Sequence, residues 1–116
     1  MNPHSIDDRQ RLMFASCYTA VREHFSHIAI RDIIDPPHGM FDAMLARQIA
    51  ITLMRDAFNV PRRRIATILD RQRTTISFNM QTVTGRRACP VFDIAYGRIA
   101  SRAREIYLRE TRKAVA

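Results

Sequence analysis

The chain has 116 residues, 47% of them hydrophobic and 26% charged, which is typical of one globular domain with a modest core. Its two cysteines are too few for a disulfide framework and predict reduced thiols. No apolar run approaches the roughly 18 residues of a membrane span, and the N-terminal residues lack the pattern of a secretory signal, so we expect a cytoplasmic, nucleoid-associated protein.

The formal net charge of +8 is distributed unevenly along the chain. Residues 1–46 hold four arginines and six acidic residues, whereas residues 47–87 hold nine arginines and two aspartates. Residues 88–116 hold six basic and three acidic residues. Because arginine suits bidentate contacts with phosphate and guanine, the middle of the chain favours a nucleic-acid partner. The alternative is an ordinary solvated basic face.

The N-terminal part of the chain has helical spacing. Ser5 and Asp8 fit the start of a helix, because each side chain can bond the other's free backbone N–H. The helix is predicted to reach about His24, and its apolar stripe is Met13, Cys17, Val21 and Phe25. Residues 28–34 predict one or two further helical turns, and the prolines at 36–37 break the chain after them.

A longer helix is predicted from about Phe41 to Phe58. One of its faces carries Leu45, Ile49, Leu53 and Ala57. Arg47 and Arg55 lie eight positions apart elsewhere on this helix, so they point in roughly the same direction. We expect both arginines on one surface of the domain.

Two short helices separated by a tight turn follow. Residues 61–69 predict the first, with proline in its first turn and three arginines at 62–64, where positive charge opposes the helix dipole. Asp70 tolerates the left-handed conformation that a tight turn needs. The second helix is predicted over about 72–83, and its buried stripe is Ile76, Met80 and Val83.

The C-terminal part predicts one last helix. Gly85 fits the end of the preceding helix, and Cys89-Pro90 begins a helix to about Arg112. Its apolar side carries Ala95, Ile99, Ala103 and Ile106. We therefore expect an all-α, compact domain of about five to six helices over residues 1–116, with its core over about 9–109.

Residues 61–83 are predicted to form a helix-turn-helix. Its second helix opens with Arg71, Gln72, Arg73, Thr74 and Thr75. Such a helix can enter the major groove of DNA and contact base edges with side chains at its N-terminal end. The alternative is an ordinary helix start whose polar residues are capping or solvated.

Three pieces of the sequence carry a family resemblance. They are residues 46–50 (ARQIA), Arg55 and the run Arg71-x-x-Thr74-Thr75. Together they resemble the C-terminal duplex-DNA-binding domain of the bacterial replication initiator DnaA, whose fold is Trp-repressor-like, and the helix order over about 9–109 is similar as well. No GxxxxGK[ST] loop is present, so ATP-driven initiation is excluded.

The resemblance implies base contacts from the start of the second helix and phosphate contacts around it. The base-reading residues are predicted to be Arg71, Gln72, Arg73 and Thr74. The phosphate-binding residues are predicted to be Arg47, Gln48, Arg55, Arg62, Arg63, Arg64 and Thr75. For the arginines at 62–64 the assignment rests on charge alone, with a solvated face as the alternative.

Three departures from the family pattern change the expected specificity. The family usually has Asp and His where Gln72 and Arg73 stand, and a glycine-rich turn where Leu69-Asp70 stands. Its basic loop, which reaches the minor groove, is here Pro36-Pro37-His38-Gly39. Since Gln pairs with adenine and Arg with guanine, a DnaA box should be a poor ligand.

No other chemistry is indicated by the spacing of reactive residues. Cys17, His24 and His27 match no standard zinc signature, and neither cysteine has a persuasive catalytic partner. We expect no enzyme activity, no metal, no cofactor and no small-molecule substrate.

The sequence thus predicts a sequence-specific double-stranded DNA-binding regulator of transcription or replication. The rival is a protein-binding adaptor or inhibitor of that machinery, and RNA binding is disfavoured because few aromatic residues lie near the basic cluster. A homodimer or a protein partner stays open. The last helix carries the candidate residues for such a surface, Phe92, Tyr96, Ile99 and Ile106, and their alternative role is to cover the core.

Overall fold

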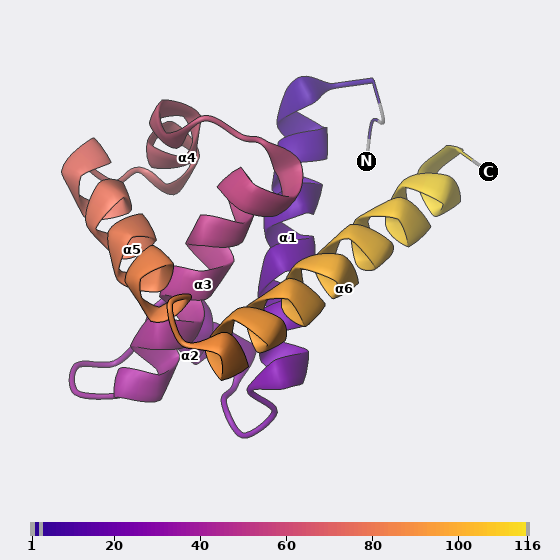
Figure 1. Cartoon of the computed structure of the whole chain (residues 1–116). Coiled ribbons are helices and arrows are strands. Elements are labelled where there is room, and N and C mark those ends of the chain that lie inside the picture. The colour runs from indigo at the N-terminus through magenta and orange to yellow at the C-terminus, as the bar shows by residue number, and fades with distance from the viewer. Residues whose placement is uncertain (1, 3, 116) are drawn as a thin grey trace.

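The computed structural model describes residue 2 and residues 4–115, which form an all-α globule (Figure 1). The helices of this part of the chain are α1 (Ile6–His24), α2 (Ile30–Ile34), α3 (Phe41–Phe58), α4 (Arg62–Leu69), α5 (Arg73–Arg86) and α6 (Pro90–Val115). The all-α prediction is confirmed, and the helix order follows the predicted one.

α3 is the central helix, and α1, α2, α4, α5 and α6 all pack against it. Between Ile49 and Met54 all six consecutive residues are buried, so this stretch is covered on every side. The sequence predicted one apolar face only, whereas neighbours surround the helix and bury Ile51 and Thr52 as well. The Thr52 hydroxyl is satisfied within the helix, because it donates to the Gln48 carbonyl at 2.8 Å.

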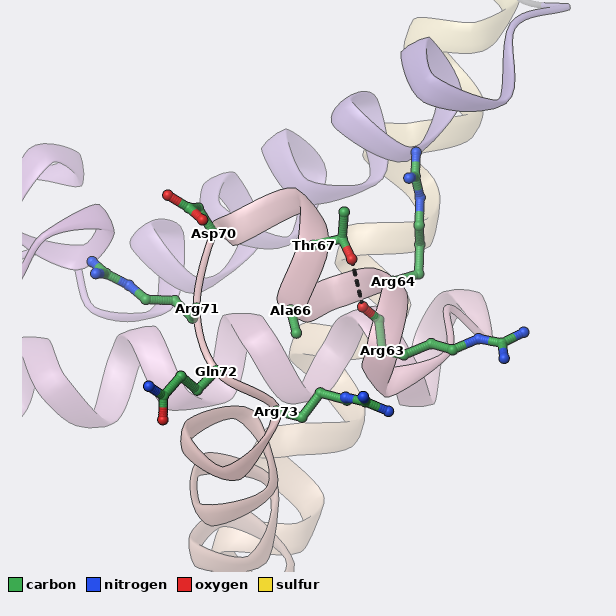
Figure 2. A pocket seen from close by; sticks show the side chains of 8 residues that line it. All are labelled: Arg63, Arg64, Ala66, Thr67, Asp70, Arg71, Gln72 and Arg73. Atoms are coloured by element: carbon green, nitrogen blue, oxygen red, sulfur yellow. Dashed lines mark hydrogen bonds between the residues drawn. The ribbon is translucent and has the colours of Figure 1, made fainter.

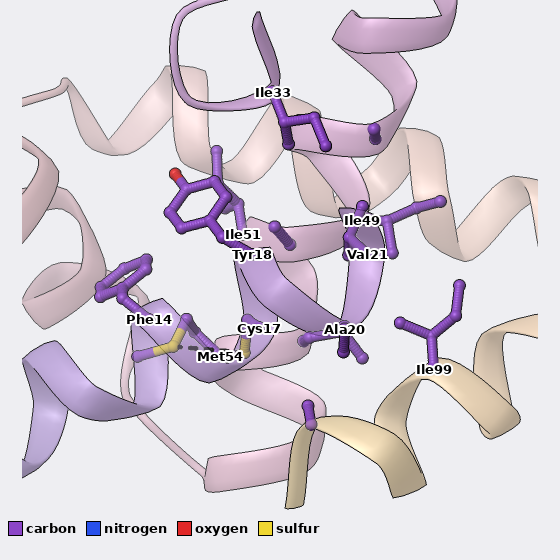
Figure 3. Close-up of a cluster of buried hydrophobic side chains, with 14 of the residues drawn as sticks. Phe14, Cys17, Tyr18, Ala20, Val21, Ile33, Ile49, Ile51, Met54 and Ile99 are labelled. Atoms are coloured by element: carbon purple, nitrogen blue, oxygen red, sulfur yellow. Dashed lines mark hydrogen bonds between the residues drawn. The ribbon is translucent and has the colours of Figure 1, made fainter. Parts of the chain in front are cut away.

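α1 packs across α3 and α6 through one stripe (Figure 3). Phe14, Cys17, Tyr18 and Val21 are buried, and the Cys17 thiol donates to the Met54 sulfur at 3.7 Å. Burial raises the pKa of this thiol well above its ordinary value. Cys17 is therefore a neutral core residue.

The predicted capping box at the start of α1 forms only in part. The Ser5 hydroxyl accepts a hydrogen bond from the Asp8 N–H at 3.3 Å, as expected for an N-cap. The Asp8 carboxylate instead accepts from the Asn2 N–H at 2.9 Å, because Ser5 N–H already donates to the Asn2 carbonyl.

α5 differs from its prediction at both ends. It begins at Arg73 with Gln72 as N-cap, and it continues through Gly85 to Arg86. Glycine lowers helix stability by only about 1 kcal/mol, and the packing of Met80 and Val83 in the core outweighs this. The prediction that Gly85 ends the helix is wrong.

α6 divides into a buried and an exposed face. Tyr96, Ile99 and Ile106 are buried and Phe92 is half-buried, so these residues cover the core. They do not supply a free dimer surface. The large apolar side chains that α6 exposes are Val91, Ile94, Leu108 and Val115.

Asp56 at the end of α3 ties α3, α5 and α6 together. Its carboxylate accepts hydrogen bonds from the Tyr96 hydroxyl at 2.8 Å and from Arg55 Nε at 2.8 Å. Arg87, which follows α5, lies 3.5 Å from the same carboxylate and 4.7 Å above the Tyr96 ring. Arg87 also pairs with Asp93 at 2.6 Å, so it serves as a structural clamp.

Candidate nucleic-acid interface

The start of α5 and the turn before it project from the globule on the side away from the end of α6 (Figure 1). All five residues from Arg71 to Thr75 are exposed, while Ile76, Met80 and Val83 anchor the helix in the core. The helix therefore exposes its polar N-terminal end to solvent, while its apolar face is fixed against the core.

The turn between α4 and α5 is set by Asp70. Asp70 has φ 53° and ψ 51°, the left-handed conformation. Its N–H donates to the Thr67 carbonyl, and the Arg71 N–H donates to the Ala66 carbonyl at 2.9 Å. This pair of bonds is a Schellman motif, which closes α4 and fixes where α5 begins.

The first turn of α5 has free backbone donors. Gln72 is its N-cap, and within the described residues no side chain caps this end. The first amides of a helix have no acceptor inside the helix, and they favour negative charge nearby. This end of α5 is suited to face a phosphate backbone or the acceptor edges of bases.

A groove of about 760 Å³ lies between α4 and the start of α5 (Figure 2). Arg63 and Arg73 extend to one side of it, and Arg71 and Gln72 extend to the other. Thr67 braces α4 through a hydrogen bond to the Arg63 carbonyl at 3.0 Å. The groove thus brings three predicted base readers, Arg71, Gln72 and Arg73, next to two predicted phosphate contacts, Arg63 and Arg64.

A second groove of about 500 Å³ runs along the opposite flank of α5. Arg47 and Gln48 from α3 line it, together with Arg71, Thr75 and Asn79. The Arg47 guanidinium donates to the Ile34 carbonyl, which holds it beside the α2–α3 connection. Three predicted phosphate-binding residues therefore meet at one place.

The remaining predicted phosphate contacts hold other partners. Arg55 pairs with Asp56, and this hydrogen bond raises the Arg55 pKa above its ordinary value. Arg62 donates to the Ser77 hydroxyl at 2.8 Å. Arg64 donates to Gln10 at 2.7 Å and pairs with Asp7. Of the three arginines at 62–64, only Arg63 has a guanidinium without a hydrogen-bond or ion-pair partner among the described residues.

Two residues of this surface were missed by the sequence analysis. Phe78 is 63% exposed, one turn along α5 from Thr74, and Asn79 lines the second groove. The sequence did contain a signal for Phe78. Its helical spacing from the buried residues Ile76 and Met80 places it on the solvent-facing side of the helix. An exposed phenyl ring and an amide are side chains that contact thymine methyl groups and adenine edges.

Comparison with protein families, with curated proteins and with solved structures gave no match to this chain. None of the described helices is long and apolar enough to cross a membrane. Residue 2 and residues 4–115 contain no group of three or more His, Cys, Asp or Glu side chains that could hold a metal ion.

Proposed function

We propose that the protein binds double-stranded DNA with sequence preference and regulates transcription or replication by inserting the start of α5 in the major groove. The observation that carries the proposal is the exposed, uncapped start of α5, flanked by two arginine-lined grooves. The resemblance of residues 46–50 and 71–75 to the DnaA DNA-binding domain supports the same assignment.

Gln72, Arg73 and Thr74 are the base readers in this proposal. Arg73 forms two hydrogen bonds with guanine, Gln72 forms two with adenine, and Thr74 contacts either polar edges or a methyl group. Phe78 extends the read surface by one turn and contacts a thymine methyl. Such a helix covers a short site of a few base pairs.

Phosphate contacts come from both flanks of α5. Arg47, Gln48 and Thr75 hold one strand, and Arg63 holds the other. Arg55, Arg62 and Arg64 are bonded to side chains of the same chain, namely Asp56, Ser77 and Gln10. In this proposal they act mainly by holding the helices in place. Their removal lowers stability together with affinity.

The test is selection of bound duplexes from a random pool at near-physiological salt, followed by titration of the selected site. An enriched short motif is expected, and Arg73→Ala should weaken binding to it by about 1–3 kcal/mol while relaxing one position. Arg112→Ala is the matched control, because it removes one exposed positive charge at the far end of α6. Equal losses on all sequences would assign Arg73 to phosphate instead.

A protein-binding adaptor is the second candidate. Exposed apolar side chains follow one another along the α2–α3 segment beside the second groove: Ile30, Ile34, Met40, Phe41 and Met44. A surface of this kind suits a protein partner. Insensitivity to duplex sequence together with tight binding to one protein partner would favour the adaptor, whereas salt-sensitive binding to all duplexes alike, without such a partner, would indicate a non-specific DNA binder.

A further inference from the structure

The outer face of α6 carries large apolar side chains that no other part of the described chain covers. α6 runs along the outside of the globule and packs against α1 and α3 with its buried face (Figure 1). On its other face Val91, Ile94 and Leu108 are exposed. Apolar side chains that recur on one face of a helix, instead of lying singly over a surface, indicate a contact with another molecule.

These side chains belong to one regular stripe of the helix. Exposed residues follow one another along it in alternating steps of three and four residues: Val91, Ile94, Arg98, Ser101, Glu105 and Leu108. This alternation is the a/d spacing of a coiled coil, which aligns side chains so that a second helix can pack against them. We call this set of residues the α6 stripe. It is apolar at both ends and has a small residue at its centre.

The two charges of the α6 stripe have opposite signs and lie on opposite sides of its centre. Arg98 precedes Ser101 by three residues, and Glu105 follows it by four. The Arg98 guanidinium has no hydrogen-bond or ion-pair partner among the described residues. Glu105 accepts from Arg102 at 3.2 Å, but its side chain is still 66% exposed. Both charges can therefore contact a partner on this face.

A second copy of this chain complements the stripe in one orientation. With two α6 helices antiparallel and the two-fold axis at Ser101, Arg98 of each copy faces Glu105 of the other. Ile94 of each copy then lies at the level of Leu108 of the other. In a parallel pair Arg98 would face Arg98 and Glu105 would face Glu105, so like charges would meet. One charge of each sign, at matching distances from the centre, suits a copy of the same stripe better than a partner of a single charge sign.

We infer that the protein forms a symmetric dimer in which the α6 stripes of two copies pack antiparallel. A two-fold contact uses the same surface on both copies, so each favourable contact is made twice. The two arginine-lined grooves beside α5 contain no residue of the upper or lower half of the stripe, so the contact does not use the predicted DNA surface. The dimer does not depend on DNA binding, and its failure would leave the proposed function standing.

Sedimentation equilibrium over a range of protein concentrations tests the dimer. The wild type should pass from monomer to dimer as the concentration rises. Ile94→Glu should weaken the dimer by at least about tenfold, because a charge replaces an apolar side chain in the contact. Ile94 is 58% exposed in the single chain, so the melting temperature of the dilute variant should be that of the dilute wild type. Ile6→Glu is the matched control and should dimerise normally, since Ile6 is 60% exposed at the start of α1.

A charge swap tests the antiparallel orientation. Arg98→Glu alone brings two glutamates together at each contact, and Glu105→Arg alone brings two arginines together. Each change should weaken the dimer by about tenfold. The double variant Arg98→Glu with Glu105→Arg restores opposite charges and should dimerise like the wild type. A parallel dimer would show no such rescue, because residues of the same number would face each other in every variant.

Three outcomes would overturn the antiparallel dimer. A wild type that stays monomeric up to its highest soluble concentration would remove the dimer altogether. A dimer that forms as tightly in Ile94→Glu as in the wild type would place the contact on another surface. Single charge reversals that weaken the dimer, without recovery in the double variant, would exclude the pairing of Arg98 with Glu105.

Discussion

At the scale of single residues, arginines that look alike in the sequence have three kinds of surroundings in the structure. Arg87 and Arg102 are held by carboxylates, the latter by Glu23 at 2.8 Å and Glu105 at 3.2 Å. Arg62 bonds to a hydroxyl, whereas Arg63 and Arg73 extend into solvent. Only an arginine without a carboxylate partner keeps its donors available for phosphate or guanine.

Phe78 provides the prediction at this scale. Because its ring is 63% exposed, Phe78→Ser should change the free energy of unfolding by no more than about 0.5 kcal/mol. If the ring covers a thymine methyl, replacing that thymine by uracil should weaken wild-type binding by about 0.8 kcal/mol. The same replacement should not change the affinity of the Phe78→Ser variant for the duplex. Equal sensitivity of both proteins to uracil would assign the methyl contact to another residue.

At the scale of elements, the α4–α5 turn decides the direction in which α5 leaves α4. The only residues with positive φ in the described chain are Gly39, Asn59 and Asp70. Asn59 ends α3 and Asp70 ends α4, so the two connections around α4 are both closed by left-handed residues. Each is a short polar residue that tolerates this conformation without being glycine.

Substitutions at Asp70 test this turn. Asp70→Gly relieves the left-handed backbone and should leave the free energy of unfolding unchanged or raise it by up to about 1 kcal/mol. Asp70→Val should lower it by about 1–2 kcal/mol, because a β-branched residue is strained there. Urea denaturation measures both. The two variants lose the same charge, so equal stability would show that the backbone conformation is not the controlling factor.

At the scale of the whole molecule, Asp56 connects the C-terminal end of α5 to α3 and α6. Burial raises the pKa of its carboxyl, but the hydrogen bonds from Arg55 and Tyr96 and the charge of Arg87 outweigh this and hold the pKa below its ordinary value of 3.8. The pKa of Tyr96 is raised by burial and by its bond to Asp56. The network therefore stabilises the fold in its charged form.

Asp56→Asn should lower the free energy of unfolding by about 1–3 kcal/mol at neutral pH. Because the folded pKa is depressed, this contribution is fully present above the ordinary carboxyl pKa of 3.8 and is lost as the pH falls through the lower folded value. The difference between wild type and variant should then shrink below pH 4 or so. Asp42→Asn is the control, since its carboxylate is 72% exposed and should matter little. A difference that stays constant with pH would contradict the charged network.

Much of the fold could be predicted because helical spacing and turn chemistry are local. The bounds of α3 follow from its periodicity and from Pro36 and Pro61, and the turn at Asp70 follows from the conformational tolerance of that residue. The errors came from contacts across the fold. α5 passes Gly85 because Val83 is packed in the core, and that packing is invisible to local propensity.

The sequence by itself determined the all-helical class, the helix-turn-helix spacing and the concentration of arginine around it. Only the tertiary structure decided which arginines are available. Asp7 and Gln10 meet Arg64 across more than fifty residues of chain, and Asp56 occupies Arg55 and Arg87. Pairing between distant charges depends on how helices pack. Within the described residues, the same packing leaves the Tyr18 hydroxyl buried without a hydrogen-bond partner.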